Sequence, residues 1–336
     1  MKTGVLLVNL GTPDSPSVRD VRKYLQQFLM DRRVIDIPPV NRFLLINAII
    51  APLRAPKSAK VYKELWQEHG SPLLFWGKAL CEKVQKSLGS SYVVVLGMRY
   101  QNPSLKEVLD FLKKQNIQKL VVLPLFPQYA SASTGSAIEE VMRIIKKWEV
   151  IPTVKFISNF FAHPLFIKAF AEIGKAYMNS YDYEHYIFSY HGLPERQILK
   201  ASVEDYCKLS ECCNKYHTKN YYCYRAQCYE TTRLLTKELN IPPDKYSVAF
   251  QSRLGKTPWI KPYADELIVQ LAQKGIKSIL FFSPSFISDC LETTIEGGIE
   301  YRDIFIKNGG HTWQLVESLN DNATWVDCVC QLVQEA

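Results

Sequence analysis

Short, continuous apolar runs recur along this chain and alternate with stretches of helical periodicity. The runs are continuous rather than alternating and are rich in Val, Ile, Leu and Phe, which is typical of parallel strands buried on both faces of a sheet. Their alternation with amphipathic helices indicates βαβ units and therefore an α/β fold. The eight runs span residues 4–10, 92–98, 119–125, 153–157, 185–190, 246–251, 278–283 and 312–316.

Eight strands divide naturally into two four-stranded sheets, the first ending near Ile157 and the second beginning near His185. The chain has 336 residues, which is enough for two domains. No Gly/Ser-rich linker separates the halves, so we expect them to pack closely with a cleft between them. In open α/β sheets, ligands bind outside the carboxyl ends of the strands, so the residues after each strand are the candidates for a site.

The balance of charged residues limits the kinds of ligand or surface that this chain is expected to bind. Lys and Arg number 41 and Asp and Glu 33, so the formal net charge is +8. This mild excess permits a carboxylate-bearing ligand, a phosphate or an anionic membrane surface, whereas the lack of a Lys/Arg run argues against nucleic-acid binding. The N-terminal run lacks a small-residue cleavage site, and the longest later apolar stretch, 43–53, is too short to span a bilayer. We expect a cytoplasmic protein, whose nine cysteines are free, metal-bound or redox-active rather than disulfide-paired.

Polar side chains of several types follow the predicted strands. Capping of the next helix explains "TPDSPSV" and "NPSLKEV", because Ser and Asp are favoured N-cap residues. Capping does not explain His191, Arg99 or the acidic stretch that begins at Asp289. His191 follows a buried strand and precedes a Gly-x-Pro turn. The ordinary imidazole pKa of about 6.5 suits proton exchange, and neutral imidazole is also a ligand for ferrous iron.

The stretch "SDCLETTIE" (288–296) predicts a helix capped by Ser288 or Asp289. Glu292 and Glu296 are four residues apart and therefore share one face of that helix. Paired carboxylates are common on solvated surfaces, where they carry no chemistry. Here the helix follows a buried strand, so its first turn lies at the ligand-binding edge of the sheet. The two carboxylates are candidates for carrying protons or guiding a hard cation.

Several motifs together give the chain a family resemblance. They are "LLVNLGTPDSPSVRDVRKYLQQFLMDRRVI", "GMRYQNPS", "PLFPQYASASTGS", "SYHGLP", "FQSRLGKTPWIKP" and "SDCLETTIE". In order and spacing they resemble the ferrochelatases, the terminal enzymes of haem synthesis, over nearly the whole chain. The resemblance implies insertion of Fe²⁺ into protoporphyrin IX with release of two protons. It also implies a class II chelatase-like fold of two Rossmann-like domains, which we place at residues 1–157 plus 317–336 and at residues 158–316.

The resemblance further implies roles for individual residues. His191 corresponds to the proposed pyrrole proton acceptor or metal ligand, and Glu292 to the acidic residue facing it across the macrocycle. Asp289 and Glu296 correspond to an adjoining acidic path. Arg99 suits a porphyrin propionate. The residues that would bind the porphyrin are Leu10, Arg99, Tyr100, Tyr129, Ser133 and Thr134.

Two positions depart from parts of the family pattern. Leu10 stands where relatives that use coproporphyrin tend to carry Tyr, which favours protoporphyrin IX. Gly298 replaces an acidic residue that extends the acidic path in some members. The alternatives are a coproporphyrin III ferrochelatase, a cobalt chelatase, and a haem or porphyrin carrier without turnover. The carrier would tolerate loss of His191 and Glu292, and both are present.

A cysteine-rich insert occupies residues 206–228. Thiolates select zinc, iron–sulfur clusters or copper, and the spacing leaves zinc open because structural zinc sites usually use closely spaced cysteine pairs. An internal cysteine cluster resembles that of some bacterial ferrochelatases, which favours a [2Fe–2S] cluster over zinc or free thiols. A redox-sensing protein is a further interpretation, but it leaves the polar strand ends unexplained. The candidate ligands are Cys207, Cys212, Cys213, Cys223 and Cys228.

Residues 34–60 mix Pro, apolar residues and a basic end. Taken alone, they predict a buried helix between two loops. The resemblance places them as an apolar lip over the porphyrin mouth. The nearby basic residues predict peripheral contact with an anionic membrane, such as the cytoplasmic face of the inner membrane, without insertion. These residues are Arg42, Arg54, Lys57 and Lys60. The oligomeric state is left open.

Overall fold

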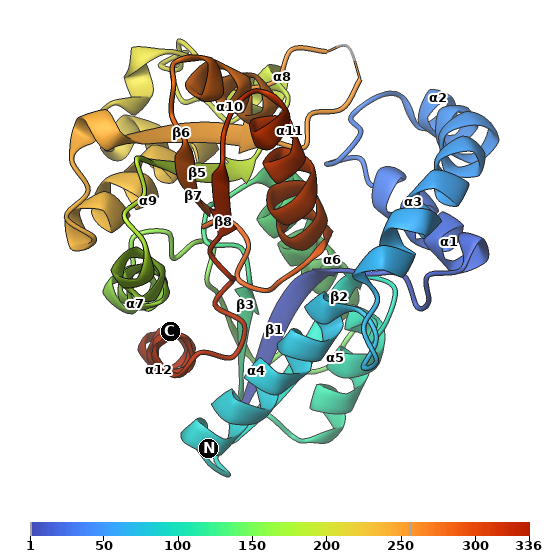
Figure 1. Cartoon of the computed structure of the whole chain (residues 1–336). Helices are drawn as coiled ribbons and strands as arrows, with labels where there is room; N and C mark the ends of the chain where they lie inside the picture. Colours follow the sequence, from blue (N-terminus) through green and yellow to red (C-terminus); the bar gives the residue numbers. More distant parts are fainter. Residues whose placement is uncertain (1, 256) are drawn as a thin grey trace. The chain divides into compact units, whose positions relative to one another are not determined.

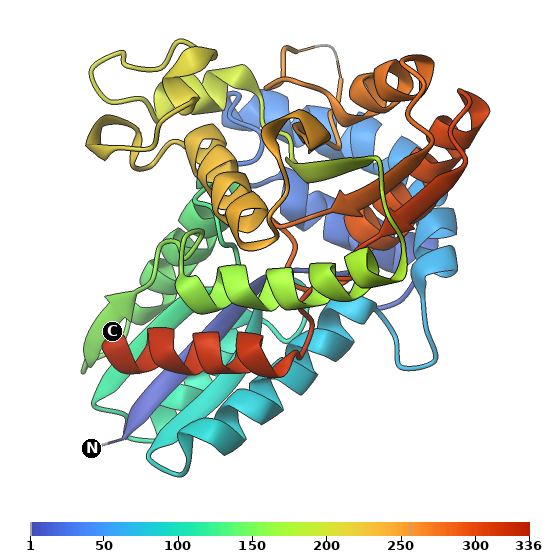
Figure 2. The same cartoon turned by 60° about the vertical axis from the view of Figure 1, so that its left-hand side comes forward.

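The computed structural model describes residues 2–255 and 257–336 (Figure 1). Its strands form two four-stranded sheets, and every neighbouring pair of strands is parallel. The strand orders are β2-β1-β3-β4 and β6-β5-β7-β8, so both sheets have the same topology. The strands of each sheet run side by side in both views (Figures 1 and 2). The strands are β1 (Thr3–Gly11), β2 (Tyr92–Tyr100), β3 (Lys119–Pro124), β4 (Thr153–Phe156), β5 (His185–His191), β6 (Tyr246–Gln251), β7 (Ser278–Phe282) and β8 (Thr312–Leu315).

Helices connect the strands, as expected for βαβ units. The α-helices are α1 (Val18–Leu29), α2 (Pro39–Leu44), α3 (Ala51–Leu65), α4 (Pro72–Leu88), α5 (Leu105–Lys114), α6 (Ser136–Ile145), α7 (Pro164–Ser180), α8 (Glu195–Lys200), α9 (Tyr224–Glu238), α10 (Ala264–Gln273), α11 (Tyr301–Lys307) and α12 (Ala323–Glu335). Three segments are π-helical, namely η1 (Leu45–Ile50), η2 (Ser131–Gly135) and η6 (Leu291–Glu300). Short 3₁₀ turns are η3 (Glu211–Cys213), η4 (Thr218–Asn220) and η5 (Pro243–Lys245). These elements confirm the α/β fold with two Rossmann-like sheets.

The chain divides into two compact units, one around each sheet. The first contains β1 to Phe126, Ala130–Asn159 and Val326–Ala336, and the second contains Pro127–Tyr129 and Phe160–Trp325. The C-terminal segment of the first unit is shorter than the expected 317–336. Residues 318 and 320 bond to Asp289, as described below, which ties this segment to the second unit.

Each sheet buries an apolar layer under its helices. In the first unit, Leu6, Val8 and Leu120 pack with residues of α5 and α6. In the second unit, Ile187, Ile279 and others pack with residues of α10 and α11. Full burial of one such side chain contributes about 1.5–3 kcal/mol to the stability of the folded unit. These apolar layers therefore hold the strands, and with them their carboxyl ends, in place.

Two helix starts confirm the capping interpretation. Ser17 Oγ accepts from the Asp20 N–H at the start of α1. Ser104 and Glu107 form a complete capping box at the start of α5. These are the serines of "TPDSPSV" and "NPSLKEV", so both stretches begin helices as expected.

Three strands run further at their carboxyl ends than the apolar runs suggest, and β1 does so by one residue, Gly11. β2 continues through Arg99 to Tyr100, and β5 continues through His191. The reason is backbone pairing, because Tyr100 pairs with Gly11 and His191 with Gln251. A Cβ at Gly11, whose φ is +117°, would lie 2.0 Å from the Tyr100 carbonyl oxygen, so this pairing requires glycine.

Candidate active site

His191 is the last residue of β5, and it is half-buried at the carboxyl end of the second sheet. Its Nδ1 lies 2.6 Å from the carbonyl oxygen of Gly192. A carbonyl oxygen can only accept, so Nδ1 carries a proton, and the tautomer that fits this contact has its lone pair on Nε2. The rings of Trp259 and Phe286 flank the imidazole, each at a centroid distance of 6.3 Å. An imidazole in this position can act chemically as a base or as a metal ligand, and its ring neighbours are aromatic.

Gly192 allows the backbone of β5 to turn close against β6. Its N–H donates to the carbonyl of Gln251, the register partner of His191, at 2.8 Å. A Cβ at position 192 would lie 2.9 Å from that carbonyl oxygen and 3.1 Å from Cε3 of Trp259. The glycine that follows His191 is therefore required by this close approach.

The side chain of Gln251 connects β5 and β6 to the acidic helix. Its Oε1 accepts from Ser189 Oγ at 2.7 Å. Its Nε2 donates to the backbone carbonyl of Glu292 at 2.9 Å and to Glu296 Oε2 at 3.1 Å. His191, Glu292 and Glu296 therefore gather around Gln251 at one sheet edge. The sequence marks Gln251 only as the polar end of an apolar run, so its connecting role was missed.

The acidic stretch forms the π-helix η6 rather than an ordinary α-helix. Its N-cap is Cys290, so the expectation of Ser288 or Asp289 as the cap is wrong. Cys290 has the extended backbone of a cap, and its N–H donates to Thr293 Oγ1 at 2.9 Å, which starts the helix there. π-Helical turns are rare and occur frequently at functional sites.

Glu296 is saturated with hydrogen bonds. Its carboxylate accepts from the Ser252 N–H at 2.9 Å, from Ser252 Oγ, from Gln251 Nε2 at 3.1 Å and from the Tyr301 hydroxyl at 2.8 Å. Burial, and then the charge of Glu296, raise the pKa of Tyr301 above its ordinary value, so the phenol stays a donor. This arrangement makes Glu296 an anchor for η6.

Glu292 has a different environment. It is half-buried, and the Cys290 thiol lies beside it. Burial, and then Glu292, raise the pKa of Cys290 well above the ordinary thiol value, so this thiol stays protonated. Among the described residues, Glu292 thus has a weak thiol donor where Glu296 has four strong ones, and it keeps room to accept a proton or a cation.

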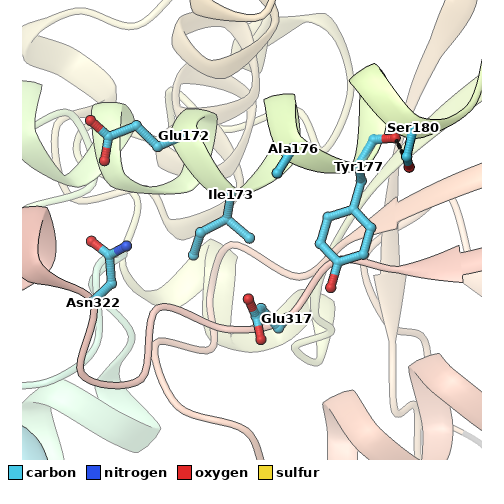
Figure 3. Close-up of a pocket in the computed structure, with 7 residues that line it drawn as sticks. All are labelled: Glu172, Ile173, Ala176, Tyr177, Ser180, Glu317 and Asn322. Atoms are coloured by element: carbon cyan, nitrogen blue, oxygen red, sulfur yellow. Dashed lines mark hydrogen bonds between the residues drawn. The ribbon is translucent and has the colours of Figure 1, made fainter.

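Asp289 points toward the loop after β8. Its carboxylate accepts from the Ser318 N–H at 3.1 Å and from Asn320 Nδ2 at 2.8 Å. Burial, and then Asp289, raise the pKa of Glu317. Figure 3 shows Tyr177 extending from α7 towards the loop that carries Glu317, at a pocket of about 510 Å³. The pocket is lined by Glu172, Ile173, Ala176, Tyr177, Ser180, Glu317 and Asn322.

Arg99 and Tyr100 meet at Asp31 in the first unit. Arg99 Nη2 lies 2.7 Å from Asp31 Oδ2, and its Nε donates to Ser136 Oγ at 2.7 Å. The Tyr100 hydroxyl donates to Asp31 at 2.9 Å, and Tyr100 is only 2% exposed. Burial alone would raise the pKa of Asp31, but hydrogen bonds from Ser136 and the Arg33 N–H, with the Arg99 charge, lower it. The Arg99 charge is thus balanced within the unit.

The other predicted porphyrin contacts differ in exposure. Leu10 and Ser133 are half-buried, whereas Thr134 in η2 is fully buried. The Thr134 hydroxyl has no hydrogen-bond partner among residues 2–255 and 257–336. In the second unit, the Tyr129 N–H donates to Gln227 Oε1 at 2.7 Å.

Four of the five insert thiols are close neighbours, and all are free of disulfides. Cys212 and Cys213 have their Sγ atoms 4.0 Å apart. The Cys213 thiol donates to Cys223, which raises the pKa of Cys213 and lowers that of Cys223. Cys207 lies beside Cys212, and its pKa is raised, first by burial. Cys228 is instead fully buried.

Backbone N–H groups also bond to these sulfurs. The N–H of Lys208 donates to Cys212 Sγ at 3.3 Å, and that of Leu209 to Cys207 Sγ at 3.4 Å. Within the described part of the chain, however, the side chains form no group of three or more His, Cys, Asp or Glu arranged to hold a metal ion. Among the described residues, the insert therefore has neighbouring thiols and sulfur-directed N–H groups without a preformed metal geometry.

The predicted lip comprises α2, η1 and the start of α3 in the first unit. Several apolar side chains there are more than half exposed, whereas Arg42 donates to the Ile35 carbonyl at 3.0 Å. The exposed side chains are Val40, Phe43, Leu44, Ile49 and Leu53. None of the helices built from the described residues combines the length and apolarity needed to cross a bilayer.

Known proteins resemble this chain over its whole length. A relative named ferrochelatase, from Legionella pneumophila (strain Paris), is 47% identical over 335 residues, which cover 100% of this chain and 99% of the relative. Among solved structures, SirB from Bacillus subtilis with Fe³⁺ matches with a TM-score of 0.57 and 14% identity, covering 100% of this chain and 95% of SirB. The sirohydrochlorin chelatase SirB from B. subtilis subspecies spizizenii, in complex with cobalt, matches at 0.51 and 13%, with 100% and 95% covered.

The two SirB likenesses concern the fold, and they confirm the chelatase-like architecture expected from the sequence. The family model described as Ferrochelatase matches residues 2–336. Together with the 47% identity over the full length, this match shows that the chain belongs to the ferrochelatase family.

Proposed function

We propose that this chain is a protoporphyrin ferrochelatase, which inserts Fe²⁺ into protoporphyrin IX and releases two protons. The observation that supports it most directly is the pair of His191, with its Nε2 lone pair, and Glu292, both held around Gln251 at one sheet edge. Family membership supports the reaction class.

The chemistry explains why a base and a carboxylate are needed together. A free-base porphyrin holds two N–H protons in its plane, and the metal cannot enter until they leave. We infer that His191 Nε2 accepts a pyrrole proton or binds the incoming iron, and that Glu292 takes the complementary role. An imidazole with an ordinary pKa of about 6.5 can take up a proton and pass it on near neutral pH. Glu296 and Asp289 support this pair from fixed positions in the same unit.

The porphyrin contacts divide into two groups. Tyr129, Ser133 and Leu10 remain our proposed ring contacts because each is partly exposed. Thr134, also predicted from the resemblance, is fully buried, so its proposed role rests on its unpartnered hydroxyl alone. Arg99 and Tyr100 are engaged by Asp31, so their proposed role is to fix the wall that carries them.

Anaerobic turnover tests the proposal. Purified protein is incubated with Fe²⁺ and either protoporphyrin IX or coproporphyrin III, and metalloporphyrin formation is followed by absorbance. We expect faster insertion into protoporphyrin IX, with Leu10→Tyr shifting the ratio of kcat/KM toward coproporphyrin III. Binding of protoporphyrin IX without insertion of Fe²⁺ would instead support the carrier alternative, and preferential insertion of Co²⁺ would support a cobalt chelatase.

We also propose that the insert binds a [2Fe–2S] cluster through Cys207, Cys212, Cys213 and Cys223. Four neighbouring thiols with N–H groups directed at their sulfurs fit the donor chemistry of such a cluster. The cluster would supply one-electron chemistry or structural cross-linking at the insert. A visible spectrum of anaerobically purified protein tests this, together with iron, sulfide and zinc analysis. A colourless protein with stoichiometric zinc would overturn the assignment.

Finally, we propose that the protein works in the cytoplasm and contacts the inner membrane peripherally through α2, η1 and the start of α3. Exposed Val40, Phe43 and Leu53, together with the exposed basic side chains of Arg54 and Lys57 in the same segment, support contact with anionic lipid. Co-sedimentation with vesicles containing anionic lipid should fall when Leu53 is changed to Asp. Equal sedimentation of the variant and the unmodified protein would exclude this surface.

A further inference from the structure

The peptide group that joins His191 to Gly192 is held at both of its polar atoms. Its carbonyl oxygen accepts from the hydroxyl of Tyr224 at 2.8 Å. Its N–H, which belongs to Gly192, donates to the Gln251 carbonyl at 2.8 Å. Both partners come from outside β5, so packing of the second unit sets the plane of this peptide.

The orientation of this peptide determines where the imidazole points. His191 Nδ1 donates to the carbonyl of Gly192, the next carbonyl along the chain, at 2.6 Å. That carbonyl belongs to the residue whose N–H Gln251 holds, so loss of the bonds at the His191–Gly192 peptide would free the backbone on which the carbonyl sits. The bonds at both ends of the peptide thus support the backbone that holds Nδ1 and directs Nε2.

The hydroxyl of Tyr224 is well placed to hold the carbonyl end of the His191–Gly192 peptide. It is the first residue of α9 and is only 6% exposed, so its hydroxyl is shielded from competing water. A phenol is a hydrogen-bond donor, and a carbonyl oxygen must receive a donor when it is buried. On the other side of His191, its own N–H donates to Ser285 Oγ at 3.3 Å.

The same helix turn also holds a second part of the proposed site. Gln227, three residues beyond Tyr224, accepts from the Tyr129 N–H at 2.7 Å through Oε1. Its Nε2 donates to the Tyr221 carbonyl at 2.6 Å, within the cysteine-rich insert. The first turn of α9 thus contacts both His191 and Tyr129.

We propose that Tyr224 is a positioning residue for metal insertion, which fixes the proton-accepting face of His191 through the His191–Gly192 peptide. The proposal rests on the proposed function, because it requires His191 to act at the porphyrin. It adds a residue of the cysteine-rich insert whose side chain touches the backbone of His191 rather than its ring.

The test compares Tyr224→Phe with a matched control, Tyr190→Phe. Tyr190 is the residue before His191, is fully buried, and donates or accepts a hydrogen bond with Thr232 Oγ1 at 2.7 Å, so the control also removes one buried hydroxyl. We expect Tyr224→Phe to lower kcat by about 10-fold with KM values for iron and porphyrin unchanged, since loss of a group that orients a functional histidine typically costs 10–100-fold. Tyr190→Phe should keep kcat within about twofold, although both variants lose similar stability.

A spectroscopic readout separates positioning from general damage. In protein labelled with ¹⁵N-histidine, the Nδ1–H signal of His191 is assigned by its loss in His191→Ala. This signal should shift or broaden in Tyr224→Phe and stay in place in Tyr190→Phe. Equal effects of the two variants on kcat, or an unmoved His191 signal in Tyr224→Phe, would overturn the proposal.

Two further variants distinguish failure of this proposal from misfolding and from failure of the proposed function. If Tyr224→Phe does not fold, 3,5-difluorotyrosine at position 224 keeps the ring and makes the hydroxyl a stronger donor, and an unchanged His191 signal then refutes the contact. Full activity of His191→Ala would instead contradict the proposed function itself. Failure of the positioning role leaves His191→Ala inactive, so the two failures are distinguishable.

Discussion

Replacement of Glu296 by Gln tests whether Glu296 and Glu292 have different roles, although their spacing in the sequence suggests similar ones. Glu296 accepts four hydrogen bonds, two on each oxygen. A glutamine has one acceptor oxygen and one amide NH₂ group. The hydroxyls of Ser252 and Tyr301 can rotate to accept from the NH₂, but the N–H of Ser252 and the Nε2 of Gln251 cannot. In either orientation of the new amide, one of those two N–H donors faces another donor.

The energetic cost follows from that mismatch. An orphaned buried N–H costs about 1–3 kcal/mol, and the remaining bonds lose the strength that the charge gave them. We therefore expect Glu296→Gln to lower the free energy of unfolding by roughly 3 kcal/mol. For a unit of this size, that corresponds to a fall in Tm of about 6–12 °C. Tyr301→Phe removes only one donor and should cost about 1 kcal/mol.

The assay pairs thermal unfolding with anaerobic turnover, both without added lipid. Glu292→Gln should abolish turnover and leave Tm within about 2 °C, because its neighbour is a weak thiol donor. Glu296→Gln should lower Tm and reduce turnover through loss of the anchored η6. An unchanged Tm together with complete loss of turnover in Glu296→Gln would refute this reasoning, since Glu296 would then act as a proton carrier rather than as an anchor.

Three other outcomes are expected. The pKa of Asp31 is lowered in the folded protein, so its contribution to stability is present above the unfolded pKa of about 3.9 and is lost as pH falls through the folded pKa. Asp31→Asn should therefore flatten the stability loss below about pH 4 in acid titrations followed by circular dichroism. Gly192→Ala should cost about 1–3 kcal/mol in urea unfolding and slow insertion, because its Cβ presses on the Gln251 carbonyl. Cys213→Ser should remove the visible cluster bands whereas Cys228→Ser keeps them, and the reverse pattern would exclude our ligand set.

The sheets were predictable because their signal is local. Continuous apolar runs require burial on both faces, and each of the eight runs overlaps one strand of the two parallel sheets. The carboxyl ends were less predictable. Polar residues such as Arg99 and His191 look like loop residues, yet backbone pairing keeps them in β2 and β5.

The site was predictable in its residue types and less so in their roles. His191 and Glu292 were identified from their place after buried strands and from resemblance. The anchoring of Glu296, the cap at Cys290 and the contact of Tyr224 with His191 depend on partners far away in sequence. No periodicity or spacing encodes such contacts, because they arise only when β6, α9 and η6 pack together.

In the proposed reaction, His191 is the proton acceptor or metal ligand at the porphyrin, and no other residue is as necessary. The most direct measurement is anaerobic haem formation from Fe²⁺ and protoporphyrin IX by His191→Ala, with porphyrin affinity measured on the same sample by fluorescence. We predict that porphyrin still binds within a few-fold of the unmodified protein while haem formation falls by about 100-fold or more, as for loss of an acid–base group. Haem formation at the unmodified rate would contradict the central claim.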